Sequence, residues 1–61
     1  MLEYMVNFFT QKFNIKRDVS VLFLYNVYKL NKLDDLIKNY RNFESFEEMK
    51  EYYLGGKQNE L

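Results

Sequence analysis

The residues that could do acid–base chemistry in this chain are two adjacent pairs of carboxylates, Asp34–Asp35 and Glu47–Glu48. Each pair falls at the start of a segment with helical hydrophobic spacing, where carboxylates stabilise the positive end of the helix dipole. That structural role accounts for both pairs. The chain of 61 residues also has no His and no Cys, which excludes catalytic triads and thiolate nucleophiles. We therefore predict that the protein is not an enzyme.

The sequence also lacks the residue patterns that bind metals or cofactors. Common zinc sites use Cys and His, and an oxygen-only site needs carboxylates that converge from neighbouring elements, which the spacing does not indicate. The two glycines, Gly55 and Gly56, are adjacent and cannot form a phosphate-binding loop. We predict no cofactor and no metal.

Nucleic-acid binding is the alternative function that the basic residues suggest. Residues 23–40 can be laid out as a helix-turn-helix with Asn31 in the turn, and the candidate phosphate contacts are Lys29, Lys32, Lys38 and Arg41. Two observations count against it. The net charge of the chain is zero, whereas nucleic-acid-binding domains are usually basic. The recognition helix would also begin with Asp34 and Asp35, which repel phosphates.

Hydrophobic spacing predicts four short helices joined by short connections. Residues 2–13 and 33–43 each place their apolar side chains on one face of a helix, and residues 46–54 do the same. Residues 18–30 are apolar almost all the way round, so we expect this stretch to be buried in the bundle or its oligomer. Its alternating Val and aromatic residues also fit a strand. A strand would need a partner from another molecule, so the helix is preferred.

Polar residues mark where these helices begin and end. Asn14 suits a left-handed helix stop, and Asp18 is a candidate N-cap for the central helix. Ser45 and Glu48 have the spacing of a capping box, and Gly55 suits the left-handed position that ends a helix. We expect a single helical domain over residues 1–56 and a frayed tail over residues 57–61.

The sequence therefore predicts an all-α fold, a small bundle of three to four short helices. A chain of this length buries only about 60% of the surface that its unfolded form exposes. Small domains usually compensate with disulfides, a metal or a partner subunit, and this one lacks the Cys and His for the first two. We therefore expect it to self-associate, most simply as a homodimer.

Twelve of the residues are aromatic, more than one small bundle is expected to hide. Interfaces favour Tyr, Phe and Met, so we predict a non-catalytic interaction module that docks an aromatic helical face on a larger protein. The predicted partner-binding residues are the aromatic flanks of the first and last helices, Tyr4, Phe8, Tyr52 and Tyr53.

The kind of gene and the cellular location can also be predicted. The chain is rich in residues with AT-rich codons, and together with its size this suggests a regulator or inhibitor encoded by a phage or other mobile element. The longest apolar run is too short to cross a bilayer, which takes about 20 residues. The N-terminus also lacks the basic region of a secretory signal. We expect a cytoplasmic protein without a membrane partner.

Overall fold

Four α-helices and one turn of 3-10 helix make up most of residues 2–55, the part of the chain that the computed structural model describes. The elements are α1 (Leu2–Lys12), α2 (Arg17–Lys29), α3 (Leu33–Asn39), η1 (Tyr40–Asn42) and α4 (Phe46–Leu54). The described residues contain no strand. The predicted all-α bundle is confirmed, and the strand alternative for residues 19–28 is wrong. The predicted tail, residues 57–61, lies outside the described residues.

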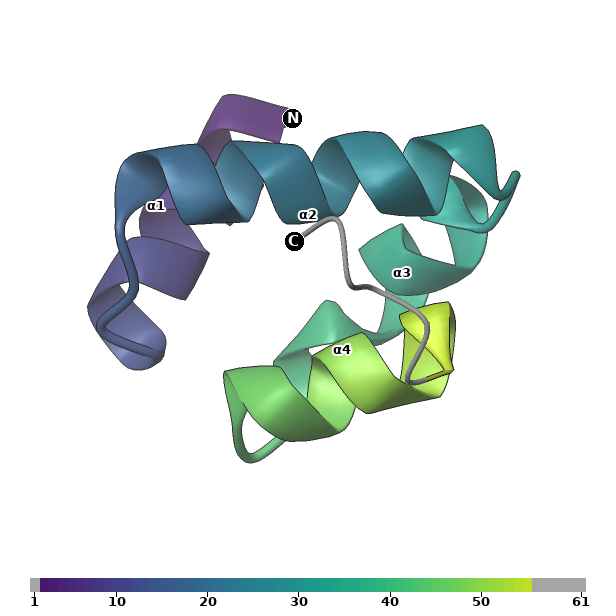
Figure 1. Ribbon diagram of the computed structural model, residues 1–61. Coiled ribbons are helices and arrows are strands. Elements are labelled where there is room, and N and C mark those ends of the chain that lie inside the picture. Colours follow the sequence, from purple (N-terminus) through teal and green to yellow (C-terminus); the bar gives the residue numbers. More distant parts are fainter. Residues whose placement is uncertain (1, 56–61) are drawn as a thin grey trace.

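The longest helix, α2, is the element around which the others are arranged. It packs against α1, α3 and α4. In Figure 1 it runs along the top of the molecule, α1 crosses behind its N-terminal half, and α3 and α4 lie below it. The covered side of α2 presents Ser20, Phe23, Leu24 and Val27, all of them buried. The core therefore lies between this side of α2 and the three shorter helices.

Aromatic rings fill much of this core. All six Phe side chains are buried or half-buried. The ring of Phe9 lies edge-on to Phe23, with centroids 6.1 Å apart, and to Tyr40 at 5.8 Å. The Phe23 ring continues to Phe46 at 5.2 Å. Such edge-on pairs add roughly 0.5–1.5 kcal/mol each beyond the area they bury, so they join α1, α2, η1 and α4 into one cluster.

Within the single chain, the central stretch is buried on one side only, and its predicted burial in an oligomer stays a prediction. Val21, Leu22, Tyr25 and Tyr28 lie on the opposite side of α2 from the core, and 38–64% of their surface is exposed. The three other helices are short and pack against α2, and its buried residues Ser20, Phe23, Leu24 and Val27 all lie on one side. One side of α2 is therefore left uncovered by residues 2–55.

The helix boundaries mostly follow the predicted signals. Asn14 has the positive φ of 56° that was expected of it, and Gly55 ends α4 at φ 61°. The Ser45 hydroxyl accepts a hydrogen bond from the Glu48 N–H at 3.1 Å. Asp18, however, is not an N-cap. Lys16 holds that position with extended backbone and no side-chain cap, and Asp18 lies in the first turn of the helix.

The third helix is shorter than predicted, and the change comes at Asn39. Its side-chain amide donates a hydrogen bond to the carbonyl of Asp35 at 2.9 Å. Side chains that bond to the backbone in this way compete with regular helical geometry. The segment predicted as helix up to residue 43 accordingly tightens into the 3-10 turn η1, whose Tyr40 is buried.

The chain has two serines, and substituting each by alanine should change stability in opposite directions. The buried hydroxyl of Ser20 has no hydrogen-bond partner among the described residues. Ser20→Ala removes that unpaired group and should raise the free energy of unfolding by about 0.5–1 kcal/mol. Ser45→Ala removes the cap of α4 and should lower it by about 1 kcal/mol. Urea unfolding followed by circular dichroism measures both changes. A loss of 1 kcal/mol or more in Ser20→Ala would contradict the assignment of Ser20 as unpaired.

Candidate functional site

Four of the eight large hydrophobic side chains that are exposed within residues 2–55 belong to α2. We call Val21, Leu22, Tyr25 and Tyr28 the α2 outer face. At 100° per residue these four positions fall on one side of the helix, and each side chain is more than one-third exposed. Scattered surface hydrophobics are ordinary, whereas contiguous apolar patches mark binding surfaces. The α2 outer face is therefore the candidate functional site.

A groove runs along one edge of this face, where α1 meets α2. Its volume is about 440 Å³. Val6, Leu24 and Leu33 form its buried or half-buried base. The exposed side chains of Leu2, Tyr25 and Tyr28 also line it. The groove thus extends the α2 outer face onto α1 and makes the surface concave, which suits the insertion of apolar side chains.

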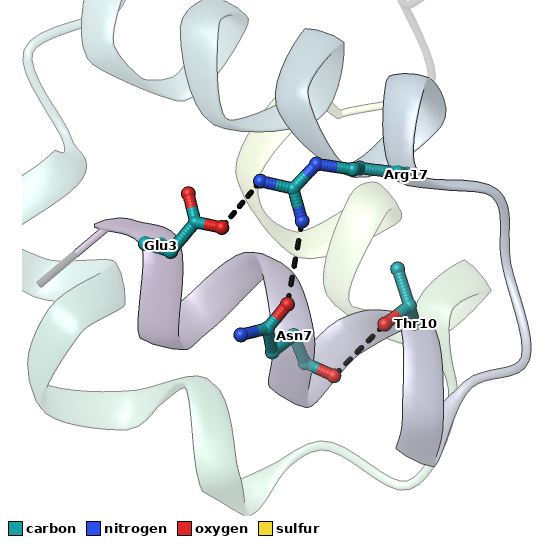
Figure 2. A network of polar contacts seen from close by, with 4 residues as sticks. All are labelled: Glu3, Asn7, Thr10 and Arg17. Atoms are coloured by element: carbon teal, nitrogen blue, oxygen red, sulfur yellow. Dashed lines mark hydrogen bonds and ion pairs between the residues drawn. The ribbon is translucent and has the colours of Figure 1, made fainter.

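A polar network lies beside the groove, and its members Glu3 and Arg17 line the groove. Figure 2 shows Arg17, at the start of α2, reaching across to two side chains of α1. Its guanidinium donates hydrogen bonds to the Glu3 carboxylate at 2.5 Å and to Asn7 Oδ1 at 3.3 Å. Thr10 donates to the carbonyl of Asn7 at 2.9 Å. The Arg17–Glu3 pair is more than half exposed, and such pairs contribute roughly 0–1 kcal/mol, so it positions α1 against α2 more than it stabilises the fold.

The α2 outer face carries opposite charges at its two ends. Asp18 lies at the N-terminal end, where it lines a shallow depression together with Val21, Leu22 and Tyr25. Lys29 lies at the C-terminal end, with its ammonium 5.2 Å from the centroid of the Tyr25 ring. Both residues are exposed, and within residues 2–55 neither forms an ion pair.

The four aromatic residues predicted to bind a partner are in different environments. Tyr4 and Tyr52 are exposed, at 55% and 65%. Phe8 is half-buried and packs edge-on against Tyr40, with centroids 5.0 Å apart. Tyr53 is buried at 2% exposure and is a core residue. No ring contact among residues 2–55 joins Tyr4 or Phe8 to the tyrosines of α4, so these four residues do not make up one surface.

Tyr53 instead connects α4 to α3. Its hydroxyl donates a hydrogen bond to Asp35 Oδ2 at 2.7 Å, and its backbone carbonyl accepts one from Lys32 Nζ at 3.4 Å. Burial raises the pKa of the Tyr53 hydroxyl well above its usual value, and the hydrogen bond to the Asp35 carboxylate raises it further. The neutral hydroxyl is thus the form that the fold requires.

The four basic residues of the alternative reading contact different parts of the molecule. Lys29 lies beside Tyr25 on α2, and Lys32 bonds to the end of α4. The Arg41 guanidinium lies 4.8 Å from the Tyr40 ring centroid and donates a hydrogen bond to the Tyr4 hydroxyl at 3.4 Å. That bond raises the pKa of Arg41 above its usual value. Lys38 is exposed on α3. Three of the four basic side chains thus contact three different parts of the fold: Lys29 contacts α2, Lys32 contacts α4, and Arg41 contacts α1 and η1.

Comparison with models of protein families, with curated proteins and with solved structures finds no match to this chain. The exposed surface of the protein is therefore the feature that bears on its function. Within residues 2–55 no three acidic side chains gather into a group that could hold a metal ion. In the same residues, no helix has both the length and the apolar character needed to cross a membrane.

Sequence reasoning missed the α2 outer face because it treated an apolar helix as a buried one. A signal was nevertheless present in the helix itself. Asp18 and Lys29 fall on the same side as Tyr25 when the residues are placed at 100° intervals. Unpaired charges are almost never fully buried, so their side of the helix had to face water.

The bond between Tyr53 and Asp35 should make the protein sensitive to high pH. A hydroxyl whose pKa is raised by folding stabilises the native state below its unfolded pKa of about 10, and that contribution is lost as the pH rises toward the folded pKa. We expect the free energy of unfolding to fall above about pH 10 and to fall less steeply in Tyr53→Phe. At neutral pH the same variant should lose about 1 kcal/mol.

Urea unfolding at pH 7 and at several alkaline values measures this dependence. Tyr28→Phe is the matched control, since it removes an exposed hydroxyl from α2 and should keep the wild-type slope. Equal alkaline slopes for wild type and Tyr53→Phe would show that the Tyr53 hydroxyl does not control this transition.

Proposed function

We propose that this protein is a small non-catalytic interaction module that binds another protein through the α2 outer face. The observation that carries the proposal is that exposed apolar side chains are concentrated on one side of α2. The four side chains of the face lie together on α2 and continue into the groove beside α1. Burying partly exposed Tyr and Leu side chains in a complex is favourable at about 25 cal/mol per Å² of apolar surface.

The proposed role is that of a regulator or inhibitor acting on a larger protein. A rigid helical face with two tyrosines suits such docking, because Tyr supplies a large contact area at a low cost in side-chain entropy. The enrichment in residue types that have AT-rich codons, together with the length of 61 residues, supports a gene carried by a phage or other mobile element. The cytoplasmic location remains a prediction.

A direct test is affinity capture from a native lysate with tagged wild-type protein and two variants. Tyr25→Glu introduces a charge at the centre of the α2 outer face and should reduce recovery of the bound protein at least tenfold, because charges at the core of an interface are strongly unfavourable. Tyr52→Glu is the matched control. It makes the same change at a tyrosine of similar exposure on α4 and should leave recovery unchanged.

The same capture, repeated with nuclease, separates this proposal from the nucleic-acid alternative. A partner that survives nuclease and is lost only with Tyr25→Glu supports a protein-binding face on α2. A partner released by nuclease would favour the alternative, as would its loss when Lys29, Lys32, Lys38 and Arg41 are all changed to alanine. Equal recovery with both glutamate variants would contradict the choice of face.

A further inference from the structure

We infer that, in the free protein, the α2 outer face is covered by the same face of a second copy, with the two α2 helices antiparallel. The inference rests on the proposed function, since it names the occupant of the same binding surface. Three properties of α2 lead to it: its single uncovered apolar side, the opposite charges at the ends of that side, and the area available for contact.

The opposite charges at the two ends of the α2 outer face are placed symmetrically about its middle. Asp18 precedes the apolar residues and Lys29 follows them, 11 positions later on the same side of the helix. A two-fold axis can stand perpendicular to α2 on its outer side, at the level midway between positions 23 and 24. It places residue 18 of one copy opposite residue 29 of the other. Each dimer then contains two Asp18–Lys29 pairs. A parallel arrangement would instead place like charges opposite each other at both ends.

The same axis aligns the apolar side chains. Leu22 of one copy lies opposite Tyr25 of the other, and both residues line the depression beside Asp18. The contact is self-complementary, as an interface with two-fold symmetry must be. Antiparallel α2 helices also set their dipoles in opposite directions, which is the favourable arrangement.

The area available for contact is smaller than that of a standard interface. The exposed parts of Leu2 and the α2 outer face amount to on the order of 500 Å² per copy, when an exposed aromatic side chain is taken to offer about 150 Å². A standard interface buries about 800 Å² per partner. We therefore expect a dimer with a dissociation constant on the order of micromolar, which exchanges readily with the monomer.

Charge reversal at the two ends of α2 tests the arrangement. Asp18→Lys places Lys opposite Lys29 of the other copy, and Lys29→Asp places Asp opposite Asp18. Each single variant should dimerise about tenfold more weakly, because each dimer exchanges two attractive pairs for two repulsive ones. An equimolar mixture of the two variants re-creates opposite charges at both ends and should regain wild-type affinity. The double variant should regain it too.

Sedimentation over about 1 μM to 1 mM, at low and at high salt, measures these affinities. Asp34→Lys is the matched control: it removes a first-turn carboxylate from α3, and it should dimerise as the wild type does. Circular dichroism confirms that each variant is folded. The differences between variants should shrink at high salt, where exposed charges are screened.

A wild type that remains monomeric at all concentrations would overturn the inference, as would single variants that dimerise unchanged or a mixture that is not rescued. None of these results bears on whether the face binds a different protein. If Tyr25→Glu loses a captured partner while the wild type is monomeric, the proposed function stands and the second copy is excluded as occupant.

Discussion

The packing of three short helices against a single side of α2 is the interaction on which the rest of the structure depends. Phe23 and Val27, on that side, are fully buried, and α1, α3 and α4 each pack against the helix that carries them. Residues 2–55 contain no further helix that could cover the opposite side, and small folds have a high ratio of surface to volume. The buried side of α2 and its exposed apolar side are thus two consequences of the same constraint.

The parts of the fold that depend on local interactions could be predicted from the sequence, and those that depend on packing could not. Ser45 and Gly55 mark the two ends of α4. They act through hydrogen bonds and backbone geometry within a few residues of themselves, so the ends of this helix can be recognised from the sequence. Tyr52 and Tyr53 are identical and adjacent, yet one is exposed and the other is bonded to α3. Which of them faces the core is decided by the position of α3. The candidate site was missed for the same reason, since the exposed side of α2 is known only once the other helices are placed.

This arrangement has a consequence for regulation. If the α2 outer face binds both a second copy and a larger partner, the two complexes compete for the same side chains. Dimerisation then lowers the concentration of the form that is free to bind, and the partner must bind more tightly than the second copy does in order to displace it. A weak dimer would keep the tyrosines of α2 covered without preventing their release.

The central claim, that α2 has a buried side and an apolar side covered only by association, can be tested with the six tyrosines of the chain. Limited nitration read by mass spectrometry reports the accessibility of each ring. At about 0.05 μM, well below the expected dissociation constant, four tyrosines should react and two should be protected. The reactive ones are Tyr4, Tyr25, Tyr28 and Tyr52, and the protected ones are Tyr40 and Tyr53. At about 1 mM, Tyr25 and Tyr28 should become protected while Tyr4 and Tyr52 remain reactive. Protection of Tyr25 and Tyr28 at the lower concentration, or reactivity that does not change between the two, would contradict the account.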